Sequence, residues 1–142
     1  MKNILVDTGF WLAINNTNDK HHKNAMSWLM NNQSKDYRFA TTWVVMCESF
    51  FLIKNFVGYK KAVALFESYS RTEYDIYDLE KESIQRVIDL MKKYEDMDVD
   101  LADVSLVLLA EKLDTGDILT VDRNDFTALR WKKNKRFKQL LF

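Results

Sequence analysis

The stretch ILVDTGFW, residues 4–11, joins a β-prone apolar run to the start of a helix across a short polar break. Residues 2–6 are predicted to form a strand, and Asp7-Thr8-Gly9 supplies residue types that suit a turn or a helix cap. Residues 10–15 are then predicted to be helical. A strand that leads directly into a helix is a typical unit of an α/β fold.

The same alternation continues along the chain. Further strands are predicted at residues 37–40, 73–77, 118–121 and 138–142. Apolar residues with helical spacing predict helices at residues 21–32, 43–55, 59–69, 80–94 and 101–113. The pattern favours a mostly parallel sheet of about five strands with helices on both faces, in a single domain over residues 1–142.

The composition is typical of a globular protein of the cytoplasm. With 142 residues, 47% of them hydrophobic, the chain can bury a core without disulfides or a structural metal. Cys47 is the only cysteine, and its apolar flanks predict a small buried side chain. No apolar run approaches the roughly 20 residues of a membrane helix, and Asp7 interrupts the first one too early for a signal peptide. We therefore expect a cytoplasmic protein without a membrane segment.

Charge is balanced overall but unevenly distributed. The formal net charge is zero, which argues against a protein that binds polyanions over its whole surface. Residues 95–103 include five acids and no base, whereas residues 123–138 are strongly basic. This is the arrangement that a metal site beside a phosphate-binding strip requires, although a solvated C-terminal face explains it equally well. The candidate phosphate-binding residues are Arg123, Arg130, Lys132, Lys133 and Lys135.

Four acidic residues lie within or beside apolar segments: Asp7 in ILVDTGFW, Glu48 in VVMCESFF, Asp103 in DLADVSLVLL and Asp122 in ILTVDRNDF. A carboxylate beside buried surface is costly unless it is paired. Asp7 and Asp122 each follow a predicted strand, and the carboxyl ends of parallel strands meet at one edge of a sheet. Asp103 begins an apolar helix that is expected to pack on the sheet, and Glu48 is expected on an apolar helix face. We therefore expect the four carboxylates to converge.

Each acid also has a purely structural explanation when it is considered alone. Asp7 and Asp103 suit helix N-termini, Asp122 suits a turn, and Glu48 could be buried in an ion pair. Considered together they predict a cation site, because two like charges about 4 Å apart repel by roughly 4 kcal/mol at an effective dielectric constant near 20. Oxygen ligands without cysteine or histidine favour Mg²⁺ or Mn²⁺, ions that promote displacement at phosphorus.

Several other polar residues are candidates for the same site. Thr8 and Thr120 are expected to donate hydrogen bonds to a neighbouring carboxylate or to a metal-bound water. Asp100 is expected to extend the acidic site. His21 and His22 follow a polar loop, so we expect them to be solvated rather than to bind a metal.

The four acidic segments, in this order and at this length, resemble the PIN domain, and most closely the VapC-type toxin ribonucleases of bacterial toxin–antitoxin pairs. The resemblance extends from Ile4 to about Arg130. It implies a Rossmann-like three-layer α/β/α fold in which the four acids form the metal-binding pocket. It also implies Mg²⁺ or Mn²⁺ as cofactor, endonucleolytic cleavage of RNA, a homodimer, and a small antitoxin that inserts into the active-site groove.

Other classes of protein fit less well. A phosphorelay receiver domain requires an acidic pair after the first strand, where this chain has only Asp7, and a haloacid-dehalogenase phosphatase requires a second Asp where Gly9 stands. The stronger alternative is a non-toxin PIN-fold protein that processes RNA, or that only binds RNA or protein. The four acids argue against binding alone, because such a protein has no use for their mutual repulsion. The sequence therefore predicts a metal-dependent endoribonuclease, the toxin of a type II pair.

Overall fold

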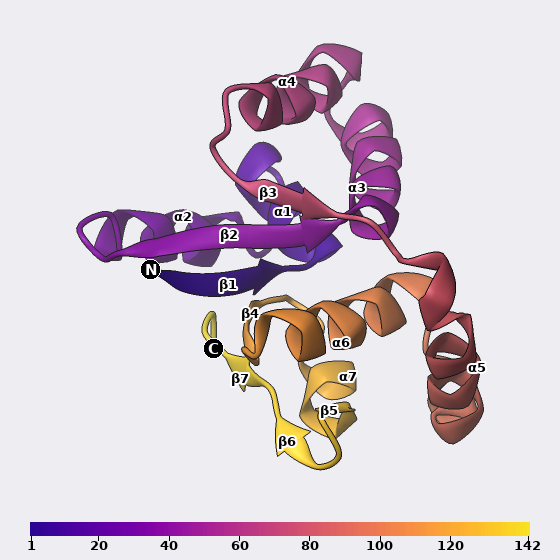
Figure 1. Ribbon diagram of the computed structural model, residues 1–142. Coiled ribbons are helices and arrows are strands. Elements are labelled where there is room, and N and C mark those ends of the chain that lie inside the picture. The colour runs from indigo at the N-terminus through magenta and orange to yellow at the C-terminus, as the bar shows by residue number, and fades with distance from the viewer.

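A computed structural model describes residues 1–142 and contains a central sheet of five strands with helices on both faces (Figure 1). Every pairing in this sheet is parallel. The predicted α/β architecture with a sheet of about five strands is therefore confirmed. In spatial order the strands are β3 (Asp75–Tyr77), β2 (Tyr37–Thr42), β1 (Lys2–Val6), β4 (Asp117–Leu119) and β7 (Lys138–Gln139).

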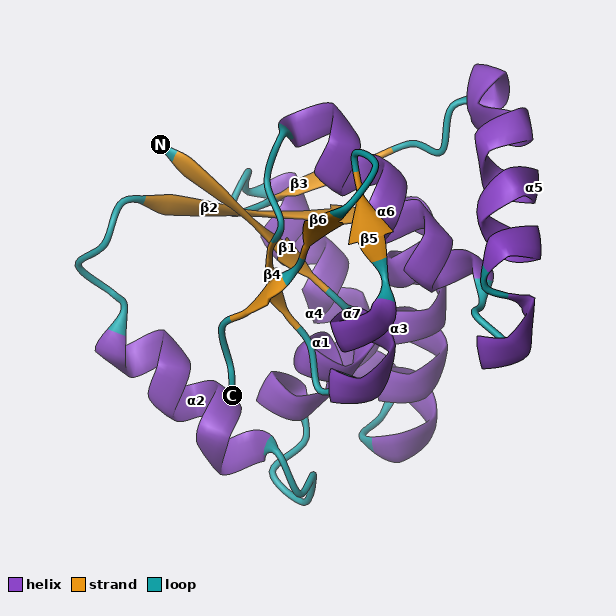
Figure 2. Cartoon of the chain, turned by 90° about the horizontal axis from the view of Figure 1, so that it is seen from below, coloured by secondary structure: helices purple, strands orange, loops and turns teal.

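The helices form two layers, one on each face of the sheet (Figure 1). One layer contains α1 (Thr8–Asn15), α2 (His22–Asn31), α3 (Trp43–Phe56) and α4 (Tyr59–Ser70). The other contains α5 (Ile84–Lys93), α6 (Leu101–Leu113) and α7 (Arg123–Ala128). Figure 2 shows the same chain from below, with α5 at one side of the molecule. None of these helices combines the length and the apolar character that crossing a bilayer requires.

The order in which strands are added to the sheet changes direction between β1 and β4. The connections from β1 to β2 and from β2 to β3 run toward one edge, whereas β4 connects to β7 at the other edge. Neighbouring parallel strands whose connections diverge in this way leave a crevice at their carboxyl ends, where ligands bind in open α/β sheets. Val6 pairs with Leu119, so Asp7 and Thr120 leave the two strands at the same level.

Helix α6 supplies much of the core on its side of the sheet. It packs against β1, β2 and α3 as well as α5. Its apolar residues recur on almost every face, because the helix is covered by the sheet and by other helices. Complete burial of each such Val or Leu contributes about 1.5–3 kcal/mol. The buried apolar residues of α6 are Ala102, Val104, Leu106, Val107, Leu109 and Ala110.

Gly9 allows α1 to begin directly against the end of β4. A Cβ at this position would overlap the side chain of Val121. We therefore expect Gly9→Ala to lower the free energy of unfolding by about 1–3 kcal/mol, as overpacking typically does. Urea denaturation checks this value. Val121→Ala should remove most of the loss in a double-mutant cycle, and an equal loss in both backgrounds would contradict the proposed overlap.

The structure corrects the prediction for Cys47 and adds one helix and one pair of strands. Cys47 is exposed rather than buried, because α3 turns its other side, with Val45, Met46 and Ile53, toward the core. Helix α7 and a small antiparallel pair, β5 (Arg130–Trp131) and β6 (Lys135–Arg136), were not predicted. These elements are too short to show a hydrophobic period. Short 3-10 turns, Lys81–Ser83 and Glu95–Met97, precede and follow α5.

Candidate metal centre

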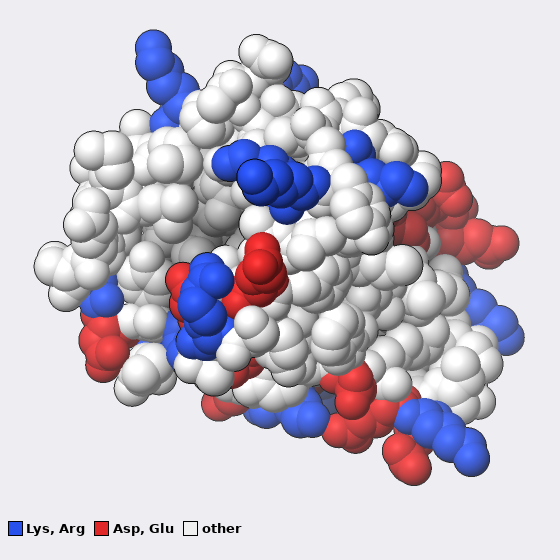
Figure 3. All heavy atoms as spheres, turned by 90° about the horizontal axis from the view of Figure 1, so that it is seen from above, with Lys and Arg blue, Asp and Glu red and all other residues white.

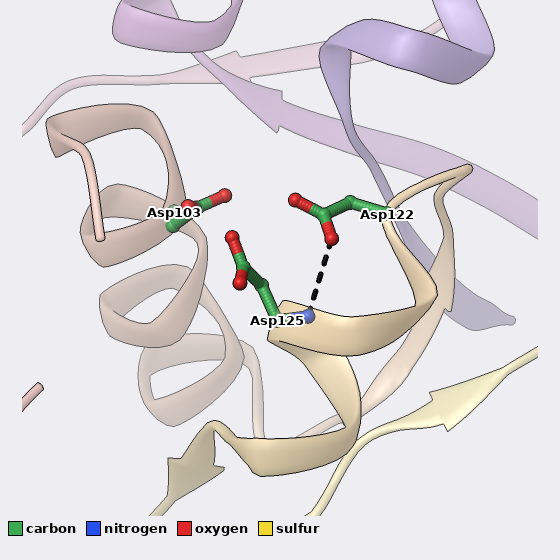
Figure 4. Close-up of side chains that lie close together, drawn as sticks. All are labelled: Asp103, Asp122 and Asp125. Atoms are coloured by element: carbon green, nitrogen blue, oxygen red, sulfur yellow. Dashed lines mark hydrogen bonds between the residues drawn. The ribbon is translucent and has the colours of Figure 1, made fainter. Parts of the chain in front are cut away.

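Three aspartates converge near the carboxyl ends of β1 and β4. Asp103 lies in the first turn of α6, Asp122 immediately precedes α7, and Asp125 lies in the first turn of α7. One carboxylate oxygen from each lies within 4.8 Å of the other two, and Figure 4 shows the three carboxylates pointing toward one another. Asp122 Oδ1 also accepts a hydrogen bond from the Asp125 backbone N–H at 3.2 Å, which caps α7 and fixes the pair.

Asp7 is fixed next to these carboxylates by two hydrogen bonds. Its Oδ1 accepts from the Thr8 backbone N–H at 2.7 Å, and its Oδ2 accepts from Thr120 Oγ1 at 2.9 Å. The same Thr120 hydroxyl accepts from the Asp122 backbone N–H at 3.0 Å. One buried hydroxyl therefore connects the acid after β1 with the acid after β4. This is one of the roles that the sequence predicted for Thr120.

Burial and mutual repulsion disturb the ionisation of these acids. Burial, more than any other cause, raises the pKa of Asp7 to about 6, and the charge of Glu48 adds to the rise. Burial likewise raises the pKa of Asp103 to about 8, and Asp7 is the largest of the four neighbouring charges that raise it further. The pKa of Asp125 rises to about 6, again mainly through burial and then through Asp122. The site therefore retains a proton at neutral pH, chiefly on Asp103, unless a cation replaces it.

No basic side chain of the protein neutralises this cluster. The ion pairs of the structure involve other acids, and the Thr8 hydroxyl is buried without a hydrogen-bond partner. The carboxylate oxygens of Asp103, Asp122 and Asp125, which lie within 4.8 Å of one another, would hold a divalent cation. Oxygen donors alone suit Mg²⁺ or Mn²⁺ better than zinc. In and around the cluster, the acids without an ion-pair partner are Asp7, Glu48, Asp100, Asp103, Asp122 and Asp125.

Two predicted site residues lie at the margin of the cluster. Glu48 is exposed, which corrects the expectation that it lies on an apolar helix face. Of its helical neighbours, Val44 is only partly buried and Phe51 is exposed, because α3 buries a different face. The charge of Glu48 nevertheless raises the pKa of Asp7. Asp100 is exposed and caps α6 by accepting a hydrogen bond from the Asp103 backbone N–H at 2.9 Å.

Asp125 is a member of the cluster that the sequence prediction missed. The signal was the spacing of Asp122 and Asp125, because an acid three residues after an N-cap acid lies beside it in the first helical turn. That signal depends on the presence of a helix at residue 123. Since α7 was not predicted, Asp125 was regarded only as the single acid of the basic segment.

Most of the predicted phosphate-binding residues lie away from the acids, around the β5–β6 hairpin. Lys132 Nζ is 2.7 Å from Asp114 Oδ1, and Lys135 Nζ is 3.8 Å from the same oxygen. Arg130 donates hydrogen bonds to three carbonyl oxygens at the end of α7. Lys133 is exposed, and Arg123 adjoins Asp122 in the chain. Contact of these residues with RNA stays a prediction.

The hydroxyl of Thr120 gives a specific test of how Asp7 and Asp122 are positioned. Thr120→Val preserves the shape but removes both hydrogen bonds, so cation affinity should fall by about 10-fold to 100-fold, as for other groups that orient ligands. Titration of Mn²⁺ by calorimetry measures this affinity. Thr120→Ser should retain it, and equal loss in both variants would mean that packing of the methyl group matters rather than the hydroxyl.

The fold and the acidic cluster define a PIN domain, and the chain belongs to this family, whose model matches residues 4–132. The resemblance seen in the sequence is therefore confirmed. Among curated proteins, the chain is similar to Ribonuclease VapC26 of Mycobacterium tuberculosis, with 26% identity over 127 residues that cover 89% of this chain and 92% of the relative. In fold it is similar to the crystal structure of Mycobacterium tuberculosis VapC20, which is described as a Sarcin-Ricin loop cleaving toxin. The TM-score is 0.74 at 21% identity, over 84% of this chain and 89% of VapC20.

Proposed function

We propose that this protein is a divalent-metal-dependent endoribonuclease, and that it is the toxin of a type II toxin–antitoxin pair in the cytoplasm. The observation that carries the proposal is the cluster of Asp103, Asp122 and Asp125, which has no basic partner and lies at the switch point of the sheet. Membership of the PIN family and the similarity to VapC26 support the same activity.

The protein's own side chains form the binding site for the ion and hold it in position. Asp103, Asp122 and Asp125, together with Asp7, would hold Mg²⁺ or Mn²⁺. Such an ion, when bound, supplies positive charge for a phosphodiester and makes water more acidic. Thr120 keeps Asp7 and Asp122 in register, and the unpartnered hydroxyl of Thr8 is available for a hydrogen bond to a water or a phosphate oxygen.

Cleavage of end-labelled RNA by the purified protein tests the proposal. We expect internal cleavage with Mg²⁺ or Mn²⁺, and none with EDTA. Cleavage that is indifferent to EDTA would exclude the metal-dependent mechanism. Mg²⁺ should also raise the melting temperature, because a ligand that binds only the folded state stabilises it. RNA binding without cleavage at any Mg²⁺ or Mn²⁺ concentration would favour the alternative, a PIN-fold binding module.

The toxin assignment is tested separately from the nuclease activity. Induced expression should arrest growth, and co-expression of an antitoxin should relieve the arrest. Relief by an antitoxin that leaves RNA cleavage in vitro unaffected would contradict inhibition at the active site. Metal-dependent cleavage without growth arrest would favour a PIN-fold enzyme of RNA processing. Sequencing the RNA ends produced after induction would identify the target.

A homodimer is also proposed, because α3 and α4 expose apolar side chains on their outer surface. Phe51 is 59% exposed and Phe56 is 67% exposed, which is unusual for two aromatic residues so close in sequence. Aromatic residues are enriched in protein interfaces. Light scattering should give twice the chain mass. Phe56→Ser should shift that mass toward the monomer, whereas Phe142→Ser, which also removes an exposed phenyl ring, should not.

A further inference from the structure

Basic and acidic side chains form separate small groups on the face drawn in Figure 3 rather than one continuous basic surface. That face therefore offers a nucleic acid strand no continuous track of positive charge. One hollow of about 290 Å³ has the residue types of such a site. It lies between α7 and the C-terminal segment, and its lining residues are Arg123, Thr127, Arg136, Phe137, Gln139 and Phe142.

The two arginines of this hollow are the ones whose guanidinium groups make no hydrogen bond or ion pair within the protein. The Arg123 guanidinium lies 4.9 Å from the centre of the Phe142 ring. The hydrogen bonds of this residue to other side chains are made by its backbone carbonyl and not by the guanidinium. Arg136 likewise uses only its backbone carbonyl, as acceptor for Trp131 Nε1. The remaining arginines, Arg38, Arg71, Arg86 and Arg130, all bind carboxylates or carbonyls. Free guanidinium groups suit bidentate binding of phosphate.

An amide in the same hollow has an unused acceptor. Gln139 Nε2 donates to the Arg123 carbonyl at 3.0 Å and to Thr127 Oγ1 at 3.1 Å, which fixes the orientation of the amide. Gln139 Oε1 is buried and has no hydrogen-bond partner. Buried acceptors are almost always satisfied in folded proteins, so this oxygen favours a ligand with an N–H or O–H donor.

The hollow and the acidic cluster lie on opposite faces of helix α7. Arg123 and Thr127 are four residues apart and share one helix face, whereas Asp125 lies on the face toward Asp103. Six residues of α-helix span only about 9 Å. A single RNA strand that passes the start of α7 can therefore reach both the acidic cluster and the hollow.

We propose that this hollow is a nucleotide subsite for the RNA substrate, next to the nucleotide whose phosphodiester is cleaved. Arg123 and Arg136 bind a phosphate, and the Phe142 ring, which is 43% exposed, stacks on a base. Gln139 Oε1 accepts a hydrogen bond from an exocyclic amine or a ribose 2′-hydroxyl. This assignment rests on the proposed ribonuclease function and adds the position of a flanking nucleotide.

The test measures binding of a fluorescent single-stranded RNA of random sequence to full-length protein carrying Asp103→Asn, which prevents cleavage. Adding Arg136→Gln should weaken binding by about 3-fold to 10-fold and reduce the slope of log affinity against log salt by about 0.7, the value for one phosphate contact on a single strand. Phe142→Ala should weaken binding several-fold without changing that slope, because stacking releases no counterions. Lys92→Gln on α5 is the matched control for loss of one charge and should have little effect.

Equal effects of Arg136→Gln and Lys92→Gln would overturn the subsite, because the loss would then reflect net charge alone. Unchanged RNA affinity together with loss of binding to an oligoglutamate peptide in Arg136→Gln would assign the hollow to an acidic protein segment and also overturn it. Cleavage by the wild-type chain is measured in parallel. Metal-dependent cleavage with no effect of Arg136→Gln refutes only the subsite, whereas absence of cleavage refutes the proposed function.

Discussion

Asp103→Asn is expected to reduce metal-dependent RNA cleavage by about 1,000-fold or more while the protein remains folded. The substitution removes a carboxylate from the group that would hold the ion, and the charge stabilisation at stake is several kcal/mol, which corresponds to a factor of this size. The melting temperature of the metal-free protein should not fall, because folding of the original protein requires Asp103 either to hold a proton or to repel its neighbours, and the amide of Asn requires neither. Single-turnover cleavage and thermal unfolding measure the two quantities.

A matched control separates the cluster from general loss of negative charge. Asp89 is an exposed aspartate on α5, and Asp89→Asn should leave cleavage within about two-fold of the original rate. Asp125→Asn provides a second test, because the structure places this unpredicted residue in the cluster. Full activity of the purified Asp103→Asn protein would assign the carboxylates a structural role.

The strands and the long helices were predictable because their physical causes are local. The apolar run of β1 and the all-round apolar character of α6 are visible in short windows of sequence. The position of Asp7 and Asp122 at one edge of the sheet also followed, because parallel strands share that edge. The helix over residues 101–113 has the predicted bounds for the same reason.

The parts of the site that were not predicted depend on tertiary geometry. Glu48 has apolar neighbours in sequence, but the side of α3 that is buried depends on how the helix rests on the sheet and on α1. The membership of Asp125 depends on α7, which is stabilised by the Asp122 cap and the buried Phe126 rather than by any long pattern. Thr120 was a predicted hydrogen-bond donor, but its bond to Asp7 joins residues 113 positions apart, and no sequence spacing indicates which carboxylate accepts it.

The metal-free protein is expected to become less stable as the pH rises from about 5 to 8, and Mg²⁺ should abolish most of this loss. The folded-state pKa values of Asp7 and Asp103 lie above the ordinary value of 3.8, at about 6 and about 8. Between the unfolded and folded pKa values the folded protein holds more protons than the unfolded chain, so its stability falls as pH rises. Below about pH 4 these carboxyl groups are protonated in both the folded and the unfolded state, and none of this stability has yet been lost.

Carboxylates outside the site make the protein more stable as the pH rises, but they do so over a lower pH range. Ion pairs hold the pKa values of Glu80, Glu111 and Asp114 below their usual range, so their stabilising contributions are already complete above about pH 5. The buried acids therefore dominate between pH 5 and 8. After allowance for screening by solvent, because Asp103 is not fully buried, their effect is on the order of several kcal/mol, or roughly 10 °C in melting temperature.

Thermal unfolding in EDTA at several pH values, repeated with Mg²⁺, measures this effect. The Asp103→Asn protein should show a clearly smaller pH dependence in EDTA, because its most strongly perturbed carboxyl group is gone. A bound cation favours the ionised carboxylates, so it should raise the melting temperature at pH 8 more than at pH 5. A melting temperature in EDTA that rises steadily from pH 5 to 8 would show that these acids are already neutralised within the protein, and that the cluster does not require a cation.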